Sequence, residues 1–169
     1  MLRPTPTSNQ LHLDDNDFIV SKTDLLGKII YGNKLFIKMS GYPEAELIGT
    51  PHSILRHPDM PKAVFKLLWE TLKKKEEIFA YVKNLAKDGS HYWVFANVTC
   101  TLSQNGTVRD YHSVRRKPSD RAMNIIPSLY RELLQSEHTQ GVAASEKLLF
   151  QKLAEQGVSY HDFILSIQK

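Results

Sequence analysis

The chain has 169 residues, with 22 Lys and Arg against 18 Asp and Glu, and its formal net charge is +4. Hydrophobic residues make up 41% and charged residues 24%, which is ordinary for one globular domain with room for an appendage. The basic runs at residues 73–75 and 115–117 are much shorter than a nucleic-acid-binding arm, so we interpret both as solvated surface charge. The composition therefore argues against a nucleic-acid partner.

Cysteine content and hydropathy predict the compartment. The single cysteine, Cys100, cannot form an internal disulfide and suits a reducing cytoplasm. The absence of a run of about 18 apolar residues predicts no membrane span. Residues 1–16 contain no apolar signal-peptide core and predict an unstructured lead-in. We expect a cytoplasmic protein.

The first half of a mixed domain is predicted over residues 17–60. Residues 17–23 and 28–32 have the composition of strands and form a hairpin across Leu26-Gly27. Asn33 is a good cap for a helix that ends at Gly41. A short second helix follows from Pro43 to Gly49.

The second half of that domain runs to residue 118. A longer helix is predicted from Pro61 to about Lys75. Three strands follow, and the turns Asp88-Gly89 and Asn105-Gly106 between them are strong hairpin signals. The predicted strands cover residues 79–87, 91–103 and 107–117. The domain over residues 17–118 is thus predicted to be α+β with a five-stranded antiparallel sheet.

Residues 119–169 are predicted to form a helical appendage. Leu129, Leu133, Leu149 and Leu153 belong to two amphipathic stretches that are separated at Gly141. This segment has too few apolar residues for a core of its own. We expect about three short helices that pack on the sheet or on another subunit.

The stretch PHSILRHPDMP at residues 51–61 is the most informative part of the chain. Its three prolines stiffen the backbone, and each disfavours the α region for the residue that precedes it. Polar side chains on stiff, irregular backbone are well placed to hold a ligand. His52, Arg56, His57 and Asp59 are therefore candidate binding residues.

With this stretch, several other motifs resemble the flavin-binding PAS domain of bacterial aerotaxis receptors. They are Ser40-Gly41-Tyr42, Leu68-Trp69, Val82-Lys83-Asn84, His91-Tyr92-Trp93-Val94 and Ala96-Asn97-Val98. The resemblance implies a PAS fold, with helices inserted between strands two and three. It also implies bound FAD, a sensor of redox or oxygen state in aerotaxis, a homodimer, and a downstream signalling domain or chemotaxis receptor component as partner.

An isoalloxazine ring needs flat apolar walls and a few polar contacts, and its diphosphate needs positive charge. Phe36, Phe65, Trp69, Tyr92 and Trp93 could provide the walls. Polar contacts to the ring edge could come from asparagines, and contacts to the phosphates from a basic pair. The candidate cofactor-binding residues are Asn33, His52, Arg56, His57, Asp59, Phe65, Trp69, Asn84, Trp93 and Asn97.

Several alternatives stay open from the residues alone. The aromatic side chains could be ordinary core, and Asp59 could cap the helix that begins near Pro61. His52 or His57 could bind haem, or could join Asp59 at a metal, although their spacing is poor for one. A cofactor-free PAS module for dimerisation or partner docking is the main rival, and it predicts a pocket filled by Phe36, Phe65 and Trp69.

Other classes of function lack their sequence signatures. No nucleophile elbow, Walker loop or Ser–His–Asp signature is present, so we do not expect an enzyme. No glycine-rich dinucleotide fingerprint follows a strand, and the cysteine of light-sensing flavin relatives is missing. Two places depart from the aerotaxis pattern: residues 75–79 replace its Gly-x-Pro-Trp, and Phe95 replaces a basic residue.

Overall fold

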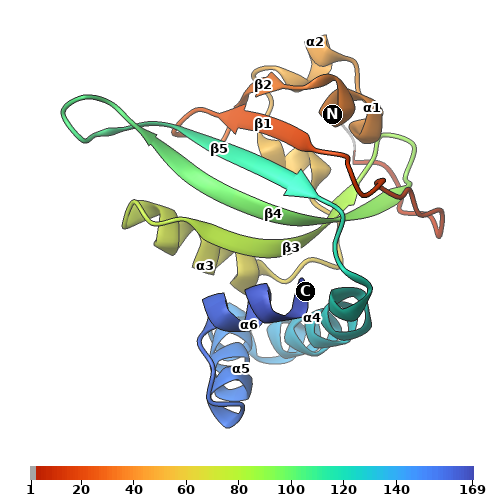
Figure 1. Ribbon diagram of the computed structural model, residues 1–169. Helices are drawn as coiled ribbons and strands as arrows, with labels where there is room; N and C mark the ends of the chain where they lie inside the picture. Colours follow the sequence, from red (N-terminus) through yellow and green to blue (C-terminus); the bar gives the residue numbers. More distant parts are fainter. Residues whose placement is uncertain (1–2) are drawn as a thin grey trace.

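A five-stranded antiparallel sheet forms the centre of the computed structural model, which describes residues 3–169 (Figure 1). The strand order is β2-β1-β5-β4-β3, and the helices α1 to α3 lie between the second and third strands of the sequence. The predicted α+β class and five-stranded sheet are confirmed. The strands are β1 Ile19–Thr23, β2 Ile29–Gly32, β3 Ile78–Leu85, β4 His91–Leu102 and β5 Val108–Arg116.

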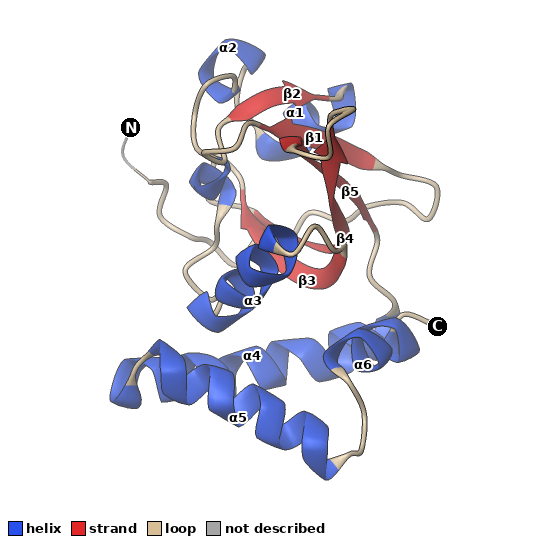
Figure 2. Cartoon of the chain, turned by 90° about the vertical axis from the view of Figure 1, so that its left-hand side faces the viewer, coloured by secondary structure: helices blue, strands red, loops and turns tan. Residues whose placement is uncertain are grey.

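The inserted segment covers one face of the sheet, which we call the inner face (Figure 2). The Asn33 side chain accepts a hydrogen bond from the Phe36 amide, and Gly41, at a φ of 71°, donates its amide to the Ile37 carbonyl. The predicted cap and stop of the first helix are therefore confirmed. The helices of the segment are α1 Lys34–Ser40, α2 Glu44–Leu47, the 3₁₀ helix η1 His52–Leu55, and α3 Lys62–Lys73.

Strand register decides which side chains face the inserted helices. Asn84 of β3 is paired with Tyr92 of β4, and Val82 is paired with Val94, so these four side chains point to the inner face. The residues between them point to the opposite, outer face. Trp93 lies between Tyr92 and Val94 and therefore cannot share a pocket with Asn84.

The last three helices wrap around the free edge of β3 (Figures 1 and 2). The hydroxyl of Tyr130 donates to the Tyr81 carbonyl at 2.7 Å, and that of Tyr160 donates to the Phe79 carbonyl at 2.9 Å. The appendage thus packs on the sheet of its own chain, one of the two expected arrangements. Its helices are α4 Asp120–Gln140, α5 Val142–Glu155 and α6 Tyr160–Ile167.

The prediction of an unstructured lead-in is wrong for much of residues 3–16, while residues 1 and 2 lie outside the described part. The amides of Thr7 and Leu11 donate to the carbonyls of Gly89 and His91, both at 2.8 Å. Gly89 has a φ of 87°, and a Cβ there would lie 2.2 Å from the Thr5 carbonyl oxygen. These backbone bonds leave no pattern in the sequence, and the segment is also held by Leu13, which is buried in the core.

Within residues 3–169, no helix has both the length and the apolar character needed to cross a lipid bilayer.

Candidate functional site

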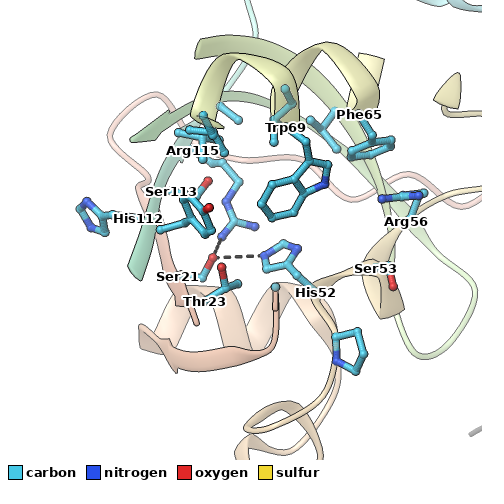
Figure 3. Close-up of a pocket in the computed structure, with 18 of the residues that line it drawn as sticks. Ser21, Thr23, His52, Ser53, Arg56, Phe65, Trp69, His112, Ser113 and Arg115 are labelled. Atoms are coloured by element: carbon cyan, nitrogen blue, oxygen red, sulfur yellow. Dashed lines mark hydrogen bonds between the residues drawn. The ribbon is translucent and has the colours of Figure 1, made fainter. Parts of the chain in front are cut away.

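A cavity of about 340 Å³ lies between the inner face of the sheet, α3 and the segment around η1 (Figure 3). This volume is at the lower end of the range for small-molecule pockets, about 300–1,000 Å³. Side chains of β1, β3, β4 and β5 form its floor, and Phe65, Leu68 and Trp69 of α3 form the opposite wall. The cavity is a slot between a helix and a sheet.

Flat and branched apolar groups line most of this slot. The Trp69 ring meets the Tyr111 ring edge-on, with centroids 5.3 Å apart and planes at 80°. Val82 and Ala96 lie on the sheet side. Helical spacing puts Phe65 and Trp69 on the same face of α3, because residues four apart are neighbours there. The slot can therefore accept a planar apolar group between α3 and the sheet.

Ser21, His52 and Arg115 form a polar cluster at one end of the slot (Figure 3). A guanidinium can only donate, so Nη2 of Arg115 donates to the Ser21 hydroxyl oxygen. The proton of Ser21 is then available for Nε2 of His52, 3.2 Å away. This order requires an unprotonated Nε2, and hence a neutral imidazole.

Electrostatics favour the same neutral state of His52. Burial, reinforced by the positive charge of Arg115, lowers the pKa of His52 to about 3. The ring is stacked on Phe36, with centroids 5.8 Å apart. Burial also lowers the pKa of Arg115, to about 10, so this guanidinium is still charged at neutral pH. The buried cation in this cluster is therefore Arg115.

A second arginine, Arg56, lines the slot beside Phe65. Its guanidinium carbon lies 3.6 Å from the centre of the Phe65 ring, and its Nε has no hydrogen-bond partner among the described residues. Nδ2 of Asn84, which is also buried and lines the slot, has no partner there either. None of the described lining residues is acidic. The slot thus combines two cations with unused donors.

Such a slot, enclosed by a five-stranded antiparallel sheet and inserted helices, matches a known family. The sequence pattern of the PAS fold covers residues 29–115, which is just over half of the chain. The chain belongs to the PAS family. The expected membership of the PAS family is confirmed. Individual proteins are similar to this PAS domain as well.

This PAS domain is 41% identical to the aerotaxis receptor of Escherichia coli (strain K12) over 130 residues, which are 77% of the chain and 26% of that receptor. It is 28% identical to the nitrogen fixation regulatory protein of Klebsiella pneumoniae over 97 residues, which are 57% of the chain and 20% of that protein. The chain therefore spans only about a fifth to a quarter of these curated relatives.

Solved structures share the fold at lower identity. The dark structure of the blue-light photoreceptor Aureochrome1 LOV has a TM-score of 0.56 at 23% identity and covers 68% of this chain and 85% of its own. A PAS domain from Colwellia psychrerythraea has a TM-score of 0.56 at 22% identity and covers 62% and 88%. These likenesses establish the architecture of the PAS domain alone.

Five of the ten candidate cofactor residues line the slot of the PAS domain. They come from η1 and its C-terminal end, from α3 and from β3. The slot is not filled by the aromatic side chains, because Phe65 and Trp69 line it while Phe36 belongs to the buried core behind it. The five lining residues are His52, Arg56, Phe65, Trp69 and Asn84.

Two candidates lie on the outer face of the sheet instead. Trp93 packs against Tyr130 of α4, with ring centroids 5.9 Å apart. Asn97 donates from Nδ2 to a carboxylate oxygen of Glu77 at 3.1 Å. Both residues alternate with the inward-facing positions of β4, so the register of the strand excludes them from the slot.

Asn33 bonds to the backbone near it. Its Oδ1 accepts from the amides of Phe36 and Val20, and its Nδ2 donates to the Phe18 carbonyl at 2.9 Å. These contacts join the start of α1 to β1. Asn33 is also not among the residues that line the slot, so it is a structural residue in this arrangement.

His57 and Asp59 also lie outside the slot. Nδ1 of His57 accepts from the Asp59 amide at 3.0 Å, and the Asp59 carboxylate accepts from Nζ of Lys83 at 2.7 Å. The alternative that Asp59 caps the following helix is wrong. The carboxylate of Glu137 caps α3 instead, and it accepts from the amides of Lys62 and Ala63 at 3.0 and 2.8 Å.

The two departures from the aerotaxis pattern lie away from the slot. Phe95 is on the outer face and stacks on Phe79, with centroids 5.5 Å apart, so its substitution removes no contact inside the slot. Lys75 has a φ of 63°, the left-handed region that suits glycine. At this departure a lysine therefore holds a conformation that glycine adopts more easily.

Arg115 and Ser21 are the functional candidates that the sequence did not suggest. The interpretation of residues 115–117 as solvated charge is wrong for Arg115, which is 2% exposed. Period-two alternation along the predicted strands was the available signal, because it places Arg115 with Tyr111 and Ser113 on one face. That signal does not tell which face is covered.

Among residues 3–169, no three His, Cys, Asp or Glu side chains come together as a metal site. His52 lines the slot, whereas His57 is packed near His91, with ring centroids 5.9 Å apart. Of the three residues considered for a metal, His57 and Asp59 therefore lie together, and His52 lies apart from them in the slot.

Proposed function

We propose that this PAS domain binds FAD non-covalently in the slot and reports redox state or oxygen supply. One observation carries the proposal: a flat apolar slot holds two arginines, no acidic residue and several unpaired buried donors. Unpaired buried donors are costly unless a ligand satisfies them. A planar ring with hydrogen-bond acceptors at its edge and an anionic diphosphate satisfies all of these features together.

The residues present fit this cofactor. Trp69 and Phe65 would pack against the isoalloxazine ring, and the free Nδ2 of Asn84 would donate to a ring acceptor. Arg56 would bind the diphosphate, since a guanidinium can hold two phosphate oxygens at once. When bound, FAD supplies reversible electron transfer. Similarity to the aerotaxis receptor and to the fold of light-oxygen-voltage domains supports a flavin.

The tail helices are in a position to respond to the slot. Val82 and Asn84 line it from β3, and the same strand presents the carbonyls of Phe79 and Tyr81 to the hydroxyls of the tail. Glu137 of α4 holds the start of α3, which carries Trp69. A change in ligand state that moves β3 or α3 would therefore alter the packing of α4–α6.

A homodimer, a downstream receptor or signalling component as partner, and a cytoplasmic location remain predictions that accompany this function. The mass of the purified protein, measured by light scattering at several concentrations, tests the dimer directly. A constant monomer mass would remove it.

The decisive experiment for FAD binding is a spectrum of the purified protein. We expect flavin absorption that bleaches on reduction, and FAD when the released cofactor is identified by chromatography. Added FAD and FMN should be compared on cofactor-free protein, because only FAD has a diphosphate for Arg56. A folded, colourless protein that takes up neither compound would overturn the proposal and favour the cofactor-free interaction module.

A further inference from the structure

Arg115 is a buried guanidinium without a counter-charge. Its side chain is 2% exposed, and among the described residues its single hydrogen-bond partner is the Ser21 hydroxyl. Nε and Nη1 have no partner, although both are capable donors. The acidic residue of the same strand, Asp110, is engaged by Nε of Arg109 at 3.1 Å. Nothing in the described chain offsets the charge of Arg115.

The immediate surroundings of Arg115 are neutral. The Phe36 ring centre is 5.1 Å from the guanidinium carbon, and His52 is held uncharged by burial. Burial beside this cluster also raises the pKa of Tyr92 to about 12, so Tyr92 does not supply a phenolate. An uncompensated buried charge is strongly unfavourable, and an anionic ligand group is the partner that relieves it.

We propose that the end of the slot formed by Arg115, Ser21 and His52 is an anion-binding site, and that it receives the edge of the flavin ring that becomes negatively charged on reduction. This inference rests on the proposed FAD function and concerns its regulation. Oxidised FAD is neutral at its ring, so Arg115 gains a counter-charge only in the reduced state. The protein therefore binds reduced FAD more tightly than oxidised FAD.

Reduction of the bound ring changes its net charge. The oxidised ring takes up two electrons and one proton, which gives it a net charge of –1. In the test, dithionite provides the electrons and is oxidised to sulfite, and the proton comes from solvent. His52 does not take up the balancing proton, because burial and Arg115 disfavour its charged form. Arg115 offsets the remaining negative charge of the ring, so no second proton is needed.

The test compares substitutions at two adjacent arginines of β5. Arg115→Gln removes the charge inside the slot, whereas Arg116→Gln removes the same charge from an exposed side chain that packs over Phe95 on the other face. Dissociation constants of oxidised and reduced FAD, and the midpoint potential of the bound flavin, are measured for each protein. Arg115→Lys, which retains the charge, serves as the rescue variant.

We expect Arg115→Gln to lower the preference for reduced FAD about tenfold to a hundredfold, which lowers the midpoint potential by about 30–60 mV for a two-electron couple. Arg116→Gln should stay within about twofold of the wild type, and Arg115→Lys should recover part of the preference.

The pH dependence of the midpoint potential gives a second readout. Below pH 7, the wild-type potential should fall by about 30 mV for each unit of rising pH, since one proton accompanies two electrons. In Arg115→Gln, where a second proton must neutralise the ring, the slope should steepen to about 60 mV.

An unchanged preference and slope in Arg115→Gln would overturn the inference while the FAD function stands. A folded Arg115→Gln protein that binds neither form would assign Arg115 to both states and would also overturn it. Arg115→Met, with a side chain of similar reach, replaces the Gln variant if that protein does not fold, with the same expected values. If the wild type takes up no FAD, the proposed function fails and this inference with it.

Discussion

The two faces of the sheet differ in how fully their buried polar groups are satisfied, although Oδ1 of Asp110 and Oγ of Ser145 also lack a described partner away from the slot. On the inner face, Arg56, Asn84, Tyr92 and Arg115 each keep at least one buried polar atom without a partner among the described residues. At the outer face and the β3 edge, the hydroxyls of three tyrosines all bond to backbone carbonyls. The unsatisfied face is suited to a ligand, and the satisfied one to permanent packing.

This contrast follows from what each region has to do. The tail helices close an edge strand, whose unpaired carbonyls would otherwise remain exposed or buried without partners. The three tyrosines are Tyr81, which donates to the Ile164 carbonyl, and Tyr130 and Tyr160, which donate to β3. Residues in this region should therefore be important for stability, whereas those of the slot should be important for ligand affinity.

The largest effect on stability is expected for Leu133→Ala, which tests the packing of the tail helices on β3. Leu133 of α4 is fully buried in the cluster that joins the tail to β3, so its truncation should cost about 2–5 kcal/mol of unfolding free energy. Denaturant unfolding measures this loss. Leu102→Ala, at a side chain that is 47% exposed, is the control and should change stability by about 0.5 kcal/mol or less. Equal effects would show that the tail is not part of the cooperative core.

Tyr130→Phe tests the hydroxyl itself. The change leaves the ring in place but deprives the Tyr81 carbonyl of its donor, which should cost about 1–3 kcal/mol. Tyr31→Phe removes the hydroxyl from an exposed tyrosine of β2 and should be nearly neutral. If both variants unfold at the wild-type denaturant midpoint, the hydrogen bond from Tyr130 to β3 contributes nothing to the unfolding free energy.

The inner face should make stability depend on pH through His52. Its pKa is about 3 in the folded protein and about 6.5 in the unfolded chain, so between these values the unfolded state binds more protons. Stability therefore rises with pH across this window and falls on acidification, by at most about 2 kcal/mol from His52 between pH 6.5 and 5.

His52→Gln should flatten this part of the stability profile, measured by denaturant unfolding at a series of pH values. His138→Gln, at an exposed position of α4, should keep the wild-type slope. A wild-type slope in His52→Gln would mean that His52 is not the group that is buried uncharged.

The smallest effect on stability is expected for Arg56→Ala. Its guanidinium lies over Phe65 and pairs with no carboxylate of residues 3–169, so its loss should cost about 1 kcal/mol or less. FAD binding should nevertheless weaken clearly, and Arg56→Lys should recover only part of it, because an ammonium lacks the two-pronged geometry. Flavin content and melting temperature are measured together. Full flavin content in both variants would remove Arg56 from the site.

Local chemistry explains what could be predicted from the sequence. The caps Asn33 and Gly41 and the turns Asp88-Gly89 and Asn105-Gly106 act within a few residues, so the elements they bound were predicted closely. The proline-rich stretch likewise placed His52 and Arg56 beside the slot. Asn84 and Trp69 belong to the family motifs, and Phe65 was predicted as a flat wall for the ring; the geometry of the slot brings all three together.

Sequence alone thus determined the α+β class, the order of elements, the family and half of the candidate site, because these depend on short-range signals. Tertiary structure decided the rest. Pairing of β3 with β4 turned Trp93 and Asn97 outward. Burial placed Arg115 in the slot, whereas the next two residues of the basic run are exposed. Glu137 caps a helix that begins 75 residues earlier in the chain. Register, burial and long-range caps arise only when distant segments meet, so no local pattern encodes them.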